Sequence, residues 1–331
     1  MRIIRKIGLL VSILFFAFAP AFAQDEAPRL GRYAFTISPL FGILYGQAEE
    51  IVFRDSRSNQ YLSQLLWDLK PLVYLGLAAG FGPRDPFAGH GFIAAGSLRF
   101  GLPFRSGNIE NRDWKNPQEN WLTHFSRHEA FIQNAILLDV SAGYSWRLTD
   151  SIALRAFMEF SFMHFSWSGE NGFIEYPDSA PYLPWPTDHP RRYIYGMVIR
   201  YSQNWFIFAP GFSLLWRINE RFSLDGNFSY SPLIYCRARD DHLHYSRPIT
   251  FWDNMFFGHY FNGGGTFIFS ARTDLDVSLS ISYRRITGTR GNTIIQDNQS
   301  GQTVRYNNAA GAGFSALDIS LAATLRLTGR N

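Results

Sequence analysis

Long stretches of the chain alternate strictly between apolar and polar residues. From Leu138 to Trp146 the apolar residues occupy every second position, and the same pattern recurs over 275–284 and 317–327. Successive side chains of a β-strand point to opposite faces, so each stretch predicts a strand with one apolar and one polar face. Strands of this length are typical of a barrel whose outer surface meets lipid, because a soluble β-sandwich turns its apolar faces inward and has shorter strands.

The alternation and its interruptions predict a single all-β domain, a ten-stranded antiparallel transmembrane β-barrel. The predicted strands are 31–46, 61–80, 91–104, 127–147, 151–167, 193–217, 221–235, 249–271, 275–289 and 310–327. Short turns are expected at 148–151, 218–221 and 272–275, and long loops at 47–61, 105–127, 168–192, 237–248 and 290–308. In outer-membrane barrels the short turns face the periplasm and the long loops face outward, which predicts the orientation of this chain.

The first 23 residues have the features of a secretory signal peptide. Arg2, Arg5 and Lys6 precede a mostly apolar run over 9–18, and Ala21-Phe22-Ala23 matches the small-x-small cleavage pattern. The mature barrel is therefore predicted to span 24–331, and the chain is predicted to be exported.

Composition agrees with a membrane barrel and gives no reason to expect a nucleic-acid partner. Hydrophobic residues make up 46% of the chain and aromatic residues 17%, yet no run of about 20 apolar residues follows the signal. The formal charge of +4 falls to +1 once the three basic signal residues are removed, too little for an electrostatic footprint on nucleic acid. Cys236 is the only cysteine, so no internal disulfide is possible, and we interpret it as a structural residue rather than a nucleophile.

Two short polar motifs carry the candidate chemistry. Asp240 and His242 lie two residues apart, after the strand predicted at 221–235, so extended backbone places both side chains on one face. A carboxylate beside an imidazole can orient the ring and make it a general base. Asn111 and Asp113 have the same spacing in another predicted loop. If the two pairs face each other across one mouth of the barrel, they form a site suited to activating water for hydrolysis.

The remaining ionisable residues predict structure rather than catalysis. His242 and His244 have no clear third ligand, so no metal site is predicted. Several charged residues fall on the inward face of predicted strands: Asp139, Arg155, Glu159, Asp276, Arg284 and Asp318. We expect them to form an ion-pair network that fills the lumen.

These residues resemble the omptin family, the outer-membrane aspartate-histidine endopeptidases of bacteria. Short segments carry the resemblance in family order: Ser63-Gln64-Leu65 with Trp67, Gly107-Asn108 leading to Asp113-Trp114, Ser126-Arg127-His128, the segment 240–251, Arg285-Ile286-Thr287, Gly291-Asn292-Thr293 and Gly311-Ala312-Gly313. The resemblance implies a monomeric barrel in the bacterial outer membrane, with its active site at the extracellular mouth. Its partners would be outer-membrane lipid and a peptide or protein substrate.

The resemblance also implies roles for the two polar motifs. In the family a water between a histidine-aspartate dyad and a pair of aspartates attacks the peptide bond; Asp240 and His242 match the dyad, and Asp113 matches the second aspartate. The first aspartate is replaced by Asn111, which is neutral and cannot take a proton, so reduced or altered activity is expected. The alternatives are a catalytically weakened barrel that serves as a surface adhesin or binding protein, and a porin-like channel.

Specificity and activation are expected to differ from the family pattern. Omptins that cleave beside basic residues use acidic side chains in the first substrate pocket; Glu50 matches one of them, but the second position is Ala238, which implies a weaker or shifted preference. Lipopolysaccharide stimulates the family through outward basic residues. The outward positions Phe160, Phe162 and His164, and the stretch 203–205, lack the matching arginines, so lipopolysaccharide stimulation is not predicted. No cofactor is expected.

Overall fold

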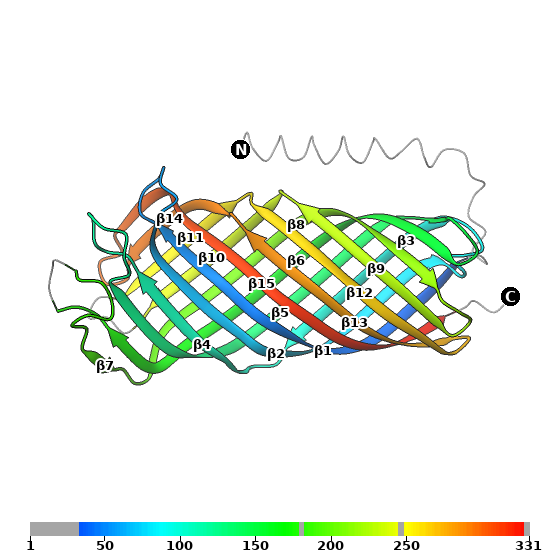
Figure 1. Cartoon of the computed structure of the whole chain (residues 1–331), viewed down its shortest axis with the longest axis horizontal. Helices are drawn as coiled ribbons and strands as arrows, with labels where there is room; N and C mark the ends of the chain where they lie inside the picture. The colour runs from blue at the N-terminus through cyan, green and yellow to red at the C-terminus, as the bar shows by residue number, and fades with distance from the viewer. Residues whose placement is uncertain (1–32, 179–181, 244–247, 328–331) are drawn as a thin grey trace.

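The computed structural model is a closed antiparallel β-barrel and describes residues 33–178, 182–243 and 248–327 (Figure 1). Its strands are β1 (Tyr33–Phe53), β2 (Tyr61–Pro83), β3 (Gly91–Gly101), β4 (Phe104–Asp113), β5 (His124–Arg147), β6 (Ile152–Glu175), β7 (Arg191–Tyr193), β8 (Met197–Arg217), β9 (Phe222–Ser231), β10 (Ile234–His242), β11 (Ile249–Phe256), β12 (His259–Arg272), β13 (Leu275–Thr287), β14 (Arg290–Asp297) and β15 (Thr303–Leu327). None of the described residues belongs to a helix long and apolar enough to span a membrane. The signal peptide predicted at 1–23 lies outside the described residues.

The ring contains ten strands, as predicted, because four of them are each divided by a short break and the three-residue β7 continues β8 along the same side of β6. The four breaks separate β3 from β4, β9 from β10, β11 from β12, and β13 from β14. Each break contains a residue that interrupts a regular ladder: Pro103, Pro232, Gly258 or Gly288. Proline lacks the backbone donor, and the two glycines have φ values of 133° and 73°, which side-chain-bearing residues rarely adopt.

Closure of the barrel depends on pairing between the first and last strands. β1 and β15 run antiparallel from the pair Phe35 and Leu327 to the pair Val52 and Ala310. Both strands therefore leave the barrel at the same end, which also carries the connections 84–90, 148–151, 218–221 and 273–274. We call this the turn end. The opposite loop end carries 54–60, 114–123, 298–302 and the described parts of the connections that follow β6 and β10, and it lies at the left of Figure 1.

The predicted long loops were wrong in extent, because the strands continue far beyond the predicted ends. β1 runs to Phe53 rather than to residue 46, and β15 begins at Thr303 rather than at residue 310. The candidate residues Asp113 and His242 are consequently the last residues of β4 and β10, not loop residues. In these segments the strands extend beyond the lipid-facing part of the barrel, so their side chains are polar. Their backbone nevertheless stays hydrogen-bonded in the sheet.

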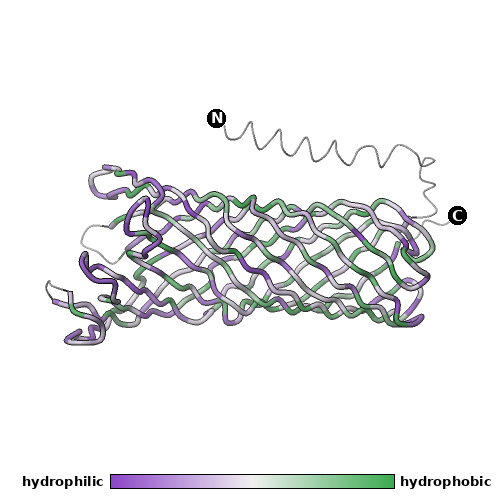
Figure 2. Tube along the Cα trace, turned by 45° about the horizontal axis from the view of Figure 1, so that its top comes forward, coloured by the Kyte–Doolittle hydropathy of each residue, from purple (hydrophilic) through white to green (hydrophobic). Residues whose placement is uncertain are grey.

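Exposed apolar side chains form a band around the middle and turn end of the barrel, where green segments recur along every strand in Figure 2. On β1 the band runs from Phe35 to Tyr45, and on β15 from Leu317 to Leu327. Ten residue steps at about 3.3 Å each, tilted by about 40°, span roughly 25 Å, the height of a lipid-facing band. Glu50 lies five residues beyond Tyr45 toward the loop end, so the candidate site stands outside the band.

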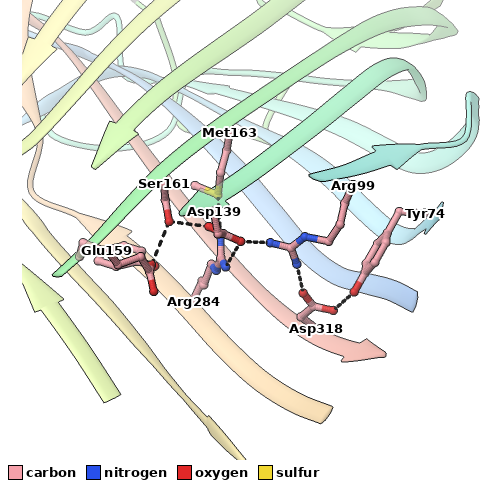
Figure 3. Close-up of polar contacts among 9 residues, drawn as sticks. Tyr74, Arg99, Asp139, Glu159, Ser161, Met163, Arg284 and Asp318 are labelled. Carbon is pink, nitrogen blue, oxygen red and sulfur yellow. Dashed lines mark hydrogen bonds and ion pairs between the residues drawn. The ribbon is translucent and has the colours of Figure 1, made fainter. Parts of the chain in front are cut away.

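Inside the band, charged side chains fill the lumen with an ion-pair network (Figure 3). Arg99 pairs with Asp139 and, at 2.8 Å, with Asp318. Arg284 donates to the same Asp139 at 3.0 Å, which joins strands from opposite parts of the ring. Ser161 Oγ lies between Asp139 Oδ1, at 2.5 Å, and Glu159 Oε1, at 2.9 Å. The predicted network is thus present around Asp139, Glu159, Arg284 and Asp318, and it packs the interior rather than leaving the open lumen of a porin. The other two predicted members form separate pairs, Arg155 with Asp225 and Asp276 with Arg326.

We expect Arg284→Ala to lower the free energy of unfolding by about 3 kcal/mol, because it leaves the buried Asp139 carboxylate with fewer compensating donors. Arg285→Ala is the matched control, since the neighbouring side chain is exposed on the outer face. Equilibrium guanidinium unfolding from lipid vesicles measures both. Equal losses in the two variants would show that the network contributes little to stability.

Candidate active site

The candidate site begins with the pair predicted from spacing on β10. Asp240 and His242 point into the barrel, and Asp240 Oδ2 lies 2.6 Å from His242 Nε2. Asp240 is 1% exposed, whereas the His242 side chain is 25% exposed. A buried carboxylate thus holds the imidazole from below while the ring faces the mouth of the barrel. The outward residue between them, Asp241, instead accepts a hydrogen bond from Thr250 Oγ1 at 2.6 Å.

The second predicted pair lies at the end of β4 and is joined by a serine from β2. Ser63 Oγ lies 2.7 Å from Asp113 Oδ1 and 3.1 Å from Asn111 Oδ1. The ladder places Ser63 directly opposite Asp113, which explains how one hydroxyl reaches both side chains. Glu110 does not join this group, because it pairs with Arg112 at 2.7 Å on the other face of the strand.

Lys115 is a site residue that the sequence interpretation missed. Its Nζ lies 2.9 Å from Asp113 Oδ2, so both oxygens of this carboxylate are engaged. The available signal was the continuation of the two-residue spacing from 111 and 113 to 115. The neutral Asn111 therefore lies near a positively charged group, the ammonium of Lys115. The side chains of Asn111 and Asp113, opposite the dyad, carry less negative charge together than two aspartates would.

The two pairs are close enough for their charges to act on one another. Burial lowers the pKa of His242, but Asp240 and then Asp113 raise it, and the net shift is upward despite an opposing effect of Lys115. Since Asp113 and Lys115 belong to the other side of the mouth, this electrostatic effect places them near the imidazole. A raised pKa keeps His242 protonated to a higher pH than a free histidine.

Glu50 lies deeper, on β1, and is 3% exposed. Burial raises its pKa well above the usual range, and Asp240 and Asp253 raise it further. Below and beside it is an aromatic cluster in which the Trp67 and Tyr201 rings stack at 4.9 Å. This packing holds the inner wall of the site rigid. Ala238, the other predicted pocket position, also faces inward and is fully buried.

Loop-end aromatic residues complete the wall beside Asn111 and were also missed. Tyr176 follows β6, and its ring lies 4.9 Å from that of His124. Burial, followed by the charge of Lys115, lowers the pKa of His124 to about 4, so this histidine is neutral at physiological pH. Arg54 ties the neighbouring loops together by donating to the Trp114 carbonyl oxygen at 2.7 Å.

The outer wall at this level carries its basic groups on β10. The outward positions Phe162 and His164 bear no arginine, but the guanidinium groups of Arg237 and Arg239 lie 5.5 Å and 4.6 Å from the Trp252 ring centroid. The described residues contain no group of three or more histidine, cysteine, aspartate or glutamate side chains placed to hold a metal ion. His244 lies outside the described residues.

The fold and the site define an outer-membrane barrel with a histidine-carboxylate centre at its mouth, and comparisons with known proteins agree. The omptin family model matches residues 32–327. The plasminogen activator of Yersinia pestis is 26% identical over 316 residues, covering 93% of this chain and 94% of that protein. The outer membrane protease OmpP of Escherichia coli K12 is 25% identical over 274 residues, covering 82% and 83%.

A solved structure supports the same architecture. The crystal structure of the outer membrane protease OmpT from Escherichia coli matches with a TM-score of 0.80 at 18% identity, covering 92% of this chain and 99% of that one. This chain belongs to the omptin family of bacterial outer-membrane proteases.

We expect Lys115→Met to raise the pKa of His242, because it removes a positive charge that opposes the protonated ring and leaves Asp113 without its ion pair. Histidine-selective NMR titration of the refolded protein measures this shift without requiring activity. Arg112→Gln is the control, since Arg112 pairs with Glu110 on the other face of β4. An unchanged or lowered pKa in Lys115→Met would place the ammonium too far from the imidazole to affect it.

Proposed function

We propose that this chain is an endopeptidase that cleaves peptides or proteins at the cell surface, beside basic residues, by a water that His242 and Asp240 activate. The observation that carries the proposal is the 2.6 Å contact between His242 Nε2 and Asp240 Oδ2 at a mouth that also holds Asp113. Membership of a protease family supports peptide-bond hydrolysis as the reaction. The signal peptide predicted at 1–23 and the position of the site at the loop end support an extracellular location.

The dyad sets which imidazole nitrogen acts as the base. Asp240 accepts a hydrogen bond from Nε2–H, so Nδ1 is the basic nitrogen of the neutral ring. Nδ1 takes a proton from water as the water oxygen attacks the carbonyl carbon. Asp240 stabilises the resulting imidazolium, which then gives its proton to the leaving amide nitrogen as the carbon–nitrogen bond breaks.

The second pair orients the water rather than taking its proton. Asp113 contacts Lys115 Nζ and accepts a hydrogen bond from Ser63 Oγ, and the remaining lone pairs of its oxygens are acceptors for water. Asn111 contributes a neutral amide at the same place. One orienting carboxylate in place of two supports a slower enzyme than the family pattern implies.

The interior of the site supports recognition of a cationic substrate side chain. Glu50 supplies a buried carboxylate on the inner wall beneath the dyad, and a guanidinium or ammonium group would neutralise it there. The closed ten-stranded ring is complete in one chain, which supports a monomer in the outer membrane.

His242→Ala is expected to lower kcat for peptide cleavage by about 100-fold or more, the contribution of a positioned general base. His164→Ala is a matched control, because that histidine lies on the outer wall and bonds to Asn204. The assay is cleavage of an arginine-containing peptide by refolded protein in detergent. Retained activity in a well-folded His242→Ala variant would remove the dyad from the mechanism.

Asn111→Asp is expected to increase kcat/KM by about 10-fold, since it adds a charged acceptor for the water, and to change the acid limb of the pH profile. The measurement compares kcat/KM against pH for both proteins in the same detergent. If wild type and variant are both folded and inactive, the adhesin or binding function becomes the better account. A faster wild type would contradict the role given to Asn111.

A further inference from the structure

Two buried carboxylates from different strands lie on the inner wall beneath the dyad. Glu50 comes from β1 and Asp253 from β11, and they are 3% and 5% exposed. Among the described residues, no lysine or arginine forms an ion pair with either group, in contrast to the lumen network. Glu50 Oε2 and Asp253 Oδ1 are buried without a hydrogen-bond partner in the described part of the chain. Buried acceptors of this kind favour a ligand that brings donors and positive charge.

The sheet register places Asp253 beside position 238, where this chain has alanine instead of an acidic residue. Ala238 on β10 lies directly opposite Asp253 on β11, and both side chains are buried on the inward side. Residues opposite each other in an antiparallel ladder have Cβ atoms about 5 Å apart. The small Ala238 side chain therefore leaves space beside the Asp253 carboxylate, which has Thr293 as its ladder partner on the other strand.

The electrostatic effects agree with this proximity. Burial raises the pKa of Asp253 to about 7, and Asp240 raises it as well. The Asp253 charge also raises the pKa of Glu50, which agrees with a position of Asp253 near that carboxylate. The other titratable groups facing them are Asp240, Tyr201 and Cys236. A cation entering this group of acids would favour their ionised forms.

We propose that Asp253, together with Glu50, forms the acidic floor that receives the basic side chain next to the scissile bond. The second carboxylate of the first substrate pocket has moved from position 238 to the facing residue of the neighbouring strand. A guanidinium has five donors in a planar fork and is able to satisfy both unpaired oxygens at once. This inference rests on the proposed endopeptidase function. It predicts a stronger preference for basic residues beside the scissile bond than Ala238 alone implies.

Binding of uncleavable peptides tests the floor separately from catalysis. The probes are two peptides with a reduced scissile bond, one with arginine at the first pocket position and one with citrulline, its neutral isostere. Wild-type protein in detergent should bind the arginine peptide at least about 10-fold more tightly by calorimetry, as expected for charged hydrogen bonds. Asp253→Asn should lose most of this ratio, and so should Glu50→Gln. Asp241→Asn should keep it, because that carboxylate points outward to Arg239 and Thr250.

A double variant tests relocation directly. Ala238→Asp combined with Asp253→Ser moves the carboxylate back across the ladder and should recover the arginine preference that Asp253→Asn loses. Wild-type selectivity that survives in Asp253→Asn would overturn the inference. Selective binding without cleavage of the corresponding ordinary peptide would leave the floor intact and contradict the proposed function instead.

Discussion

The alternation of side chains along each β-strand decides which functional groups of this barrel face the lumen. The register between strands around the closed ring fixes this alternation. Pairing of β1 with β15 leaves no free edge along their paired length and commits each residue to the lumen or to the outer surface. A shift of one residue would exchange Asp240 with Asp241 and turn the dyad outward. The site is therefore as rigid as the sheet that carries it, which suits a mechanism that depends on positioning a water.

The same barrel contains two kinds of buried acid. Asp139 and Asp318 in the membrane band are compensated by Arg99 and Arg284, and this arrangement holds opposite walls together. Nearer the loop end, Glu50 and Asp253 are buried without such compensation in the described chain, and their pKa values are raised. Burial of acids without a partner costs stability, so their presence is better explained by a ligand than by the fold.

The strand alternation predicted the number of strands and the contact between Asp240 and His242, because both depend on local backbone geometry. It placed strand ends too early, since polar side chains outside the lipid resemble a loop in sequence although the backbone remains paired. The partnership of Ser63 with Asp113 and the position of Asp253 opposite Ala238 depend on register between strands. A local sequence pattern does not determine the register between strands. These contacts of the candidate site were therefore visible only in the structure.

By its geometry and family, the loop-end mouth is a hydrolytic centre whose activity is open to direct test. The most direct test incubates refolded wild-type protein in detergent with a peptide containing a single Arg-Arg sequence and identifies the products by mass spectrometry. We predict slow cleavage at one bond beside an arginine, with a rate that rises with pH as His242 loses its proton. An intact peptide after prolonged incubation with correctly folded protein at every pH would contradict it.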